Sequence, residues 1–108
     1  MAFATFDSYP VSKFHSLIIP KRHISDFFDL NKDELFACND VIHKIKKEIE
    51  KKDKLVKGFN IGTNAGLISG QTIMHCHIHL IPRRKGDVDN PQGGVRAVIP
   101  LKQHYVRK

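Results

Sequence analysis

The segment Met74–Pro82 restricts the possible folds of this chain more than any other. Polar and apolar residues alternate along it, in the order Met-His-Cys-His-Ile-His-Leu-Ile-Pro. Successive side chains of a β-strand point to opposite faces, so this pattern predicts a strand with histidines on one face and core residues on the other. The histidine face holds His75, His77 and His79, and the core face holds Cys76, Ile78 and Leu80. The fold must therefore contain a sheet with one buried face.

A long amphipathic helix is predicted from about Asn31 to Asp53. Its apolar residues recur at spacings of three and four, and Asn31 with Glu34 forms a capping-box pattern at its start. The apolar stripe consists of Leu35, Cys38, Ile42, Ile45 and Ile49. The charge-rich stretch Lys44–Lys54 lies in the same helix, but acidic residues alternate there with lysines. This mixture favours a solvated helix face over a nucleic-acid-binding face.

The other elements are short. Residues 2–6 and 16–19 are predicted to be two strands of a hairpin, with turn-forming residues at 7–10 and a proline after the second strand. Ser25 is expected to cap a short helical turn through Phe28, residues 58–62 to form a strand, and residues 64–70 a glycine-rich loop. With 108 residues, the chain is expected to be one α+β domain, 1–108, ending in a C-terminal tail, 83–108.

The charge of the chain favours anionic partners. Eighteen Lys and Arg against eleven Asp and Glu give a formal net charge of +7 at pH 7. Such a charge attracts nucleotides, nucleic acids and acidic lipids alike, so it points to phosphate without selecting one phosphate compound.

The sequence is expected to belong to a cytoplasmic protein. No apolar run reaches the roughly 18–20 residues of a membrane span, and residues 1–10 lack the pattern of a secretion signal. The two cysteines, Cys38 and Cys76, are far apart, which excludes a Cys-x-x-Cys zinc knuckle. In a reducing compartment both are expected to be small buried apolar residues rather than a disulfide.

Three histidines on one strand face can be explained in three ways. A histidine ladder without chemistry would occupy positions that sheets usually give to β-branched residues. A single zinc ion cannot bind all three, since His75 and His79 would lie about 13 Å apart at roughly 3.3 Å per residue. An extended polyphosphate fits this spacing better. His77 would then be the central group, placed to attack phosphorus and form a covalent intermediate while its neighbours neutralise charge.

The same segment resembles the signature of the histidine triad (HIT) family of nucleotide hydrolases and transferases, His-φ-His-φ-His-φ-φ, in which φ is apolar. Gly70-Gln71-Thr72 followed by His75–Ile81 carries the resemblance. It extends over nearly the whole chain, and the tail is similar to that of prokaryotic diadenosine-polyphosphate-hydrolase-like members. Further matching positions are Asp7, Pro10–Ser12, His15, Ile19–His23, Asn60–Gly62 and Asn64.

The resemblance implies an α+β HIT-like fold: an antiparallel sheet of four to five strands with one long and one short helix, dimerising into a larger sheet. It implies transfer of a nucleoside monophosphate through His77, with His75 and His79 on either side of the α-phosphate. His15 is implied to support the triad. The implied substrate contacts are Asp7 to ribose, Asn64 and Gln71 to phosphate, and Thr72 to the phosphate or leaving group.

The chain also departs from the family pattern. Many members begin with a further strand, and many carry there two cysteines that bind zinc together with two histidines; this sequence starts at the following strand without them. We therefore expect no structural zinc, an exposed sheet edge or one strand fewer, and an altered base pocket. No cofactor is expected to be required, although Mg²⁺ can arrive bound to the polyphosphate.

The sequence thus predicts an enzyme that cleaves at the α-phosphate of a dinucleoside polyphosphate or a nucleoside phosphoramidate, acting on a purine nucleotide as a homodimer. The first alternative is a regulatory module that binds nucleotides with little turnover. The second is a basic nucleic-acid-binding protein, which the charge would suit but for which the sequence offers neither a recognition motif nor interleaved aromatics.

Overall fold

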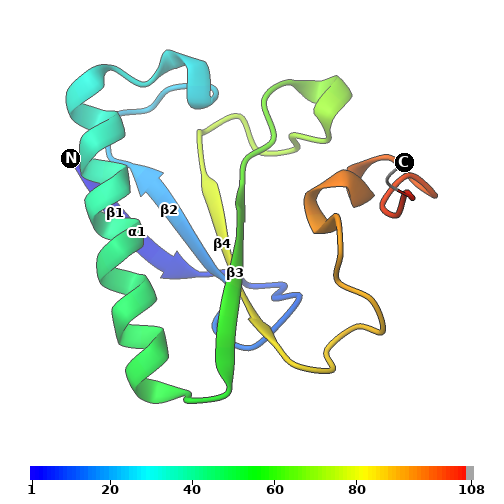
Figure 1. The fold of residues 1–108 in the computed structure, drawn as a ribbon. Helices are drawn as coiled ribbons and strands as arrows, with labels where there is room; N and C mark the ends of the chain where they lie inside the picture. Colours follow the sequence, from blue (N-terminus) through cyan, green and yellow to red (C-terminus); the bar gives the residue numbers. More distant parts are fainter. Residues whose placement is uncertain (107–108) are drawn as a thin grey trace.

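The computed structural model describes residues 1–106, and within them a long helix packs on one face of a four-stranded antiparallel sheet (Figure 1). This confirms the predicted α+β class. The strands are β1 (Ala2–Phe6), β2 (Ser16–Pro20), β3 (Val56–Gly62) and β4 (Ile78–Arg84). The helices are α1 (Lys32–Lys52) and three short 3₁₀ turns, η1 (Phe27–Asp29), η2 (Leu67–Ser69) and η3 (Gly94–Val98).

The strand order is β1-β2-β4-β3, so β4 lies inside the sheet. β1 and β2 form the predicted hairpin, paired from Ala2 opposite Pro20 to Phe6 opposite Ser16. β4 pairs antiparallel with β2 on one side and with β3 on the other, and His79 lies opposite Leu17 and Gly62. The histidine-bearing end of β4 is therefore held by a strand on each side.

The start of α1 is a capping box, as the sequence predicts. The Asn31 side chain accepts a hydrogen bond from the Glu34 N–H at 2.8 Å, and the Glu34 carboxylate accepts one from the Asn31 N–H at 3.0 Å. Glu34 is buried and also binds the Arg22 guanidinium through both oxygens, at 2.8 and 2.9 Å. The pKa of Glu34 is lowered to about 2, chiefly by this pairing with Arg22. The loop before the helix is thus tied to its first turn.

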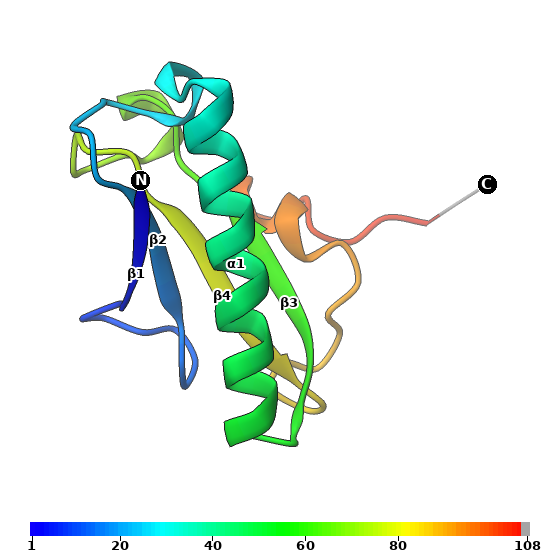
Figure 2. The ribbon, with the colours of Figure 1, turned by 90° about the vertical axis from the view of Figure 1, so that its left-hand side faces the viewer.

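The core lies between α1 and the face of the sheet that α1 covers (Figure 2). Its buried members are Ile18, Cys38, Ile49, Val56, Ile78 and Leu80. Ile42 and Ile45 pack against this cluster, but Leu35, predicted to be part of the buried stripe, is 41% exposed. In the first turn the buried position belongs instead to Glu34 with its Arg22 partner, so the apolar stripe begins one turn later than predicted.

Two boundaries differ from the prediction. The short helical turn spans Phe27–Asp29 and is capped by Asp26 rather than by Ser25, because the Asp26 carboxylate, a strong acceptor, takes the Phe28 N–H at 2.9 Å. The hydrogen-bonded part of β4 begins at Ile78 rather than at Met74. Its pairing with β2 stops at Ile78 and its pairing with β3 stops at His79, and the Cys76 N–H bonds to the Ile24 carbonyl instead. Burial still alternates from His75 onward, so the predicted faces are kept beyond the ladder.

Both cysteines are buried free thiols, as predicted. The pKa of Cys76 is raised to about 11, mainly by burial, so its sulfur stays protonated and unreactive at neutral pH. Among the described residues, no helix combines the length and the apolar character that crossing a membrane requires.

Candidate active site

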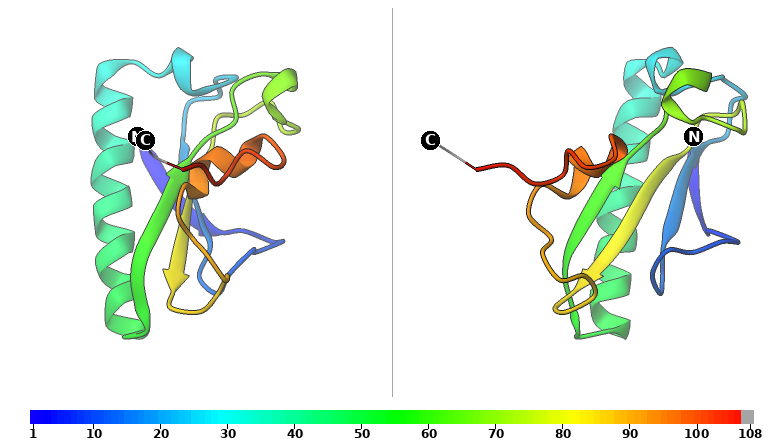
Figure 3. Two further views of the ribbon diagram at one scale, coloured as in Figure 1. Left: turned by 45° about the vertical axis from the view of Figure 1, so that its right-hand side comes forward. Right: turned by 90° about the vertical axis from the view of Figure 1, so that its right-hand side faces the viewer.

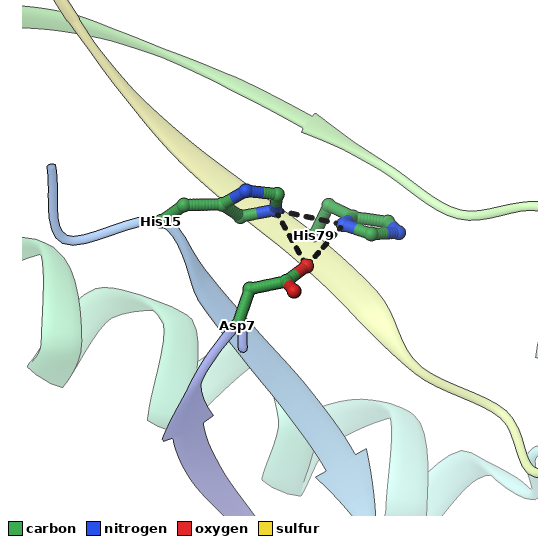
Figure 4. A group of neighbouring side chains, drawn as sticks. All are labelled: Asp7, His15 and His79. Atoms are coloured by element: carbon green, nitrogen blue, oxygen red, sulfur yellow. Dashed lines mark hydrogen bonds and ion pairs between the residues drawn. The ribbon is translucent and has the colours of Figure 1, made fainter. Parts of the chain in front are cut away.

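Three polar side chains meet on the face of the sheet that α1 leaves uncovered. Asp7 follows β1, His15 precedes β2, and His79 projects from β4 (Figure 4). His15 Nε2 and His79 Nδ1 are 2.9 Å apart, and Asp7 Oδ2 lies 3.5 Å from the first atom and 3.9 Å from the second. Three residues from separate parts of the sequence therefore form one connected polar cluster.

The connection between β1 and β2 places His15 in this cluster. The Asp7 N–H donates to the His15 carbonyl at 2.9 Å, which extends the hairpin by one pair beyond the strands. Phe14, directly before His15, has a φ of 71°, a left-handed conformation that costs energy for a bulky side chain. Its ring packs against Phe6 at a centroid distance of 5.9 Å. The bend at Phe14 leaves His15 only 3% exposed.

The hydrogen bonds determine which nitrogen of each ring carries the proton. The Val11 N–H can only donate, and it donates to His15 Nδ1 at 3.1 Å. A neutral His15 therefore carries its proton on Nε2 and donates it to His79 Nδ1. A neutral His79 in turn carries its proton on Nε2, the nitrogen that the cluster leaves free. We assign His79 as an N–H donor directed away from His15.

His79 is also kept uncharged. Its pKa lies below the ordinary histidine value, chiefly because of burial and then because of the nearby His15 and His77, while the Asp7 carboxylate opposes these effects. The folded chain thus favours neutral His79. Below the ordinary value near pH 6.5 the unfolded chain takes up this proton first, so this group contributes a loss of stability as pH falls through that range.

We predict that Asp7→Asn lowers the pKa of His79 further. The substitution removes the negative charge that favours the imidazolium, while the near-isosteric amide keeps the size of the side chain. The measurement is an NMR titration of the His79 ring protons in both proteins, with exposed His43 as an internal reference. A His79 pKa that stays constant or rises in Asp7→Asn contradicts this electrostatic assignment.

His77 has the opposite arrangement. Its Nδ1 lies 2.9 Å from the His75 carbonyl oxygen, which can only accept, so Nδ1 carries the proton. Nε2 therefore keeps an unprotonated lone pair, and no described residue hydrogen-bonds to it. The Thr63 hydroxyl donates to the His77 carbonyl at 2.7 Å and holds this backbone to the end of β3. The His77 and His79 rings lie edge to face, 5.3 Å apart. The ring that keeps a bare nitrogen and the ring that offers an N–H donor are thus neighbours.

His75 faces other protein groups. Its Nε2 donates to the Pro20 carbonyl at 2.9 Å, and its Nδ1 lies 3.0 Å from Nδ1 of His23. Because His75 Nε2 carries the proton, His23 is the donor in the second bond. Both nitrogens of His75 are therefore engaged, whereas the sequence alone implies that His75 flanks the substrate phosphate.

The remaining candidate residues belong to the loop between β3 and β4. Asn64 lines the same cavity as His79, and Thr72 is exposed. Gln71 is only 2% exposed. Its oxygen accepts from the Gly66 N–H, and its amide donates to the carbonyls of Ser25 and Ile73. The Gln71 side chain thus holds the loop together from inside, with both its oxygen and its nitrogen engaged.

Asp7, His15 and His79 are also close enough to surround a metal ion, since their ligand atoms lie within 4.8 Å of one another. The protonation pattern opposes this use. A metal on His15 Nε2 requires that nitrogen to be bare, which moves the proton to Nδ1, where it would face the Val11 N–H. The donor set therefore suits a chain of hydrogen bonds better than a divalent ion.

Sequence reasoning missed two groups that orient these rings. One is the Val11 N–H, which fixes the proton position on His15, and backbone donors leave no signal in sequence. The other is Thr63, directly after β3, where a hydroxyl residue beside a predicted strand end could have been noticed. His23 lay in a segment already matched to the family, but no role had been derived for it.

Comparison with known proteins finds a matching family and similar sequences. The profile of the HIT domain matches residues 1–86. An uncharacterised HIT-like protein of Methanocaldococcus jannaschii is 42% identical over 85 residues, covering 78% of this chain and 64% of that protein. A Schizosaccharomyces pombe protein named bis(5'-nucleosyl)-tetraphosphatase (asymmetrical) is 37% identical, covering 72% of this chain and 42% of that protein.

A solved structure shows the same fold. The crystal structure of a HIT family protein from Bacillus anthracis superposes with a TM-score of 0.74 at 37% identity, covering 80% of this chain and 60% of that one. The chain thus spans less than two thirds of the length of each of these three proteins.

Proposed function

The chain belongs to the HIT domain family, and from that premise we propose that it is a nucleotide hydrolase or nucleotidyl transferase acting through His77. The proposed reaction cleaves at the α-phosphate of a dinucleoside polyphosphate or a nucleoside phosphoramidate. The observation that carries it is the hydrogen bond from His77 Nδ1 to the His75 carbonyl, because it leaves Nε2 as a bare nucleophile. The name of the fission yeast relative supports the substrate class.

In the first step for a dinucleoside polyphosphate, the Nε2 lone pair of His77 attacks the α-phosphorus. A P–N bond forms, the bond from phosphorus to the bridging oxygen breaks, and the shortened polyphosphate leaves as its anion. The imidazole becomes positively charged, and the His75 carbonyl at Nδ1 stabilises that charge. Neutral His79 donates its Nε2 proton as a hydrogen bond to a phosphate oxygen without transferring it.

In the second step, water attacks the same phosphorus and the P–N bond breaks. His77 is restored with its proton on Nδ1, one proton of the water stays on the released monophosphate, and the other goes to solvent. Two displacements replace one difficult hydrolysis, which is the advantage of a covalent nucleophile. Asp7 and His15 take no part in bond making and are positioning residues for His79.

Incubation with diadenosine tetraphosphate and, separately, with an adenosine phosphoramidate tests this function, with products separated by chromatography. The account predicts AMP from at least one substrate, together with ATP from the tetraphosphate. Binding of both compounds without any product would instead support the regulatory module. Binding of DNA that falls steeply with salt, with no binding of either compound, would support the nucleic-acid reading.

We further propose that the chain is a homodimer. β3 is an edge strand of the described sheet, so one row of its backbone N–H and C=O groups has no strand partner. α1 also exposes two neighbouring apolar residues, Leu35 at 41% and Phe36 at 62%. A two-fold axis would cover these groups with their own copies.

Light scattering at micromolar concentration should therefore report about twice 12.3 kDa. Phe36→Lys should shift the equilibrium toward the monomer, whereas Phe28→Lys, also at an exposed phenylalanine, serves as the matched control. A monomer throughout the accessible concentration range contradicts the dimer.

A further inference from the structure

A large cavity lies between the uncovered face of the sheet and the C-terminal segment. Figure 3 shows η3 and the chain after it on the side of the sheet opposite α1, next to β3. The cavity has a volume of about 830 Å³, within the range of small-molecule pockets. Its floor comes from β3 and β4, and its wall from residues 87–104, which we call the tail lobe.

The tail lobe is a folded structure. The Gln103 amide donates to the carbonyls of Asn90 and Gln92 at 3.3 and 3.2 Å, which closes the segment on itself. Gly93 has a φ of 73°, and a Cβ there would lie only 2.2 Å from the Gln103 carbonyl oxygen, so this closure requires glycine. Gly94 rests on Asn60 of β3, where a Cβ would be 3.3 Å from Nδ2. The cavity wall is therefore held at a defined distance from the sheet.

The cavity reaches one of the two proposed reacting residues, since His79 lines it and His77 does not. His79 and Asn64 line one end of it, and His79 is the ring that neighbours His77. When the α-phosphate of a substrate lies at His77, another part of the substrate can therefore extend past His79 into the cavity. Whatever is attached to that phosphate beyond the cleaved bond can enter the space between the sheet and the tail lobe.

The charges around the cavity exclude a phosphate as its main occupant. Among residues 1–106, one arginine, Arg83, and two aspartates, Asp87 and Asp89, line it, and no lysine does. The Arg83 guanidinium is already engaged by Asp87 through two bonds, at 2.8 and 2.9 Å, and by Asn60 at 2.6 Å. An anion inside would meet more negative than positive charge, in contrast to the net charge of +7 of the whole chain.

The other lining groups suit an uncharged heterocycle that carries hydroxyls. Ile61 and Ile81 on the strands face Val95 and Val98 on the tail lobe, which offers apolar walls for a flat base. Carboxylates and amides at the rim can accept or donate hydrogen bonds to a sugar. We propose that this cavity binds the leaving nucleoside, the second one of a dinucleoside polyphosphate, and that the tail lobe makes the enzyme selective for substrates with two nucleosides. This inference rests on the proposed function.

A pair of adjacent substitutions tests the cavity. Val98→Trp places a large ring at the cavity wall, whereas Ile99→Trp makes a similar change at the next residue, which is also exposed but does not line the cavity. The readout is the ratio of kcat/KM for diadenosine tetraphosphate to kcat/KM for an adenosine phosphoramidate, which has no second nucleoside. Val98→Trp should lower this ratio about tenfold, and Ile99→Trp should leave it within twofold.

Binding provides a second readout that does not depend on turnover. In a His77→Ala background, calorimetry should show that Val98→Trp weakens binding of diadenosine tetraphosphate about tenfold and that of AMP less than twofold. Equal effects on both ligands, or on neither, would overturn the cavity assignment while leaving the proposed function intact. Loss of a dimer in Val98→Trp with unchanged ligand binding would show that a second copy of the chain fills the space. Selective binding without any turnover would instead overturn the proposed function.

Discussion

Replacing His77 with alanine is expected to reduce turnover by at least about 10⁴-fold, because the substitution removes the nucleophile itself. The fold should survive. The His77 ring is only partly buried, and the hydrogen bond that it makes goes to the His75 carbonyl, at a turn that the Thr63 hydroxyl also holds. Steady-state rates with the better substrate measure the loss, and thermal unfolding measures the stability.

His43→Ala is the matched control for this substitution. His43 is an exposed histidine on α1 whose ring, within the part of the chain that the structure describes, bonds only to the Asn39 carbonyl of the preceding turn. The control should retain turnover within twofold. If His77→Ala keeps a rate within tenfold of the original chain, His77 is not the nucleophile and the reaction is a direct attack by water.

Replacing His79 is expected to have the second largest effect. The ranking of the His79→Gln and His79→Asn activities shows which ring nitrogen of His79 supports the reaction. In His79→Gln the side-chain amide can occupy the position of Nε2 and donate to phosphate. In His79→Asn the shorter amide occupies the position of Nδ1, beside His15, and reaches no substrate. The loss of one donor to a transition-state oxygen typically costs about 10²–10³-fold in rate. We expect that loss for His79→Asn and a loss of about tenfold for His79→Gln.

The comparison should be made in kcat, with KM measured in the same experiment, since a donor to developing charge acts mainly on kcat. An order in which asparagine retains more activity than glutamine would show that the contact with His15, and not the donor to substrate, is what His79 supplies. Equal and small losses would remove His79 from the reacting centre.

Local patterns predicted most of the fold because each acts over a few residues. The capping box at Asn31 and Glu34 is one helical turn, and the alternation after His75 follows the pleat of a strand, so both appear in the structure as expected. The errors occurred where a distant partner decides the outcome. Leu35 is exposed because Arg22, from another segment, satisfies Glu34 in the buried position. β4 starts at Ile78 because Cys76, just before it, bonds to Ile24 and not to a neighbouring strand.

The candidate site shows the same limit. Its histidines could be selected from sequence, but equal spacing cannot show that His75 is engaged by Pro20 and His23 while His77 keeps a free nitrogen. The protonation of His15 depends on a backbone N–H, and the burial of Gln71 depends on the path of a loop. The tail lobe could not be predicted from the sequence for a related reason, since glycines and short polar residues specify its turns without any periodicity.

The most direct test of the central claim is to trap the covalent intermediate. The chain is mixed rapidly with diadenosine tetraphosphate, quenched in base to preserve a P–N bond, digested and analysed by mass spectrometry. The account predicts a transient adduct of one adenosine monophosphate on the peptide that contains His77, located on that residue by fragmentation and absent from His77→Ala. An adduct on any other residue, or steady product formation with no adduct at any time, would contradict it.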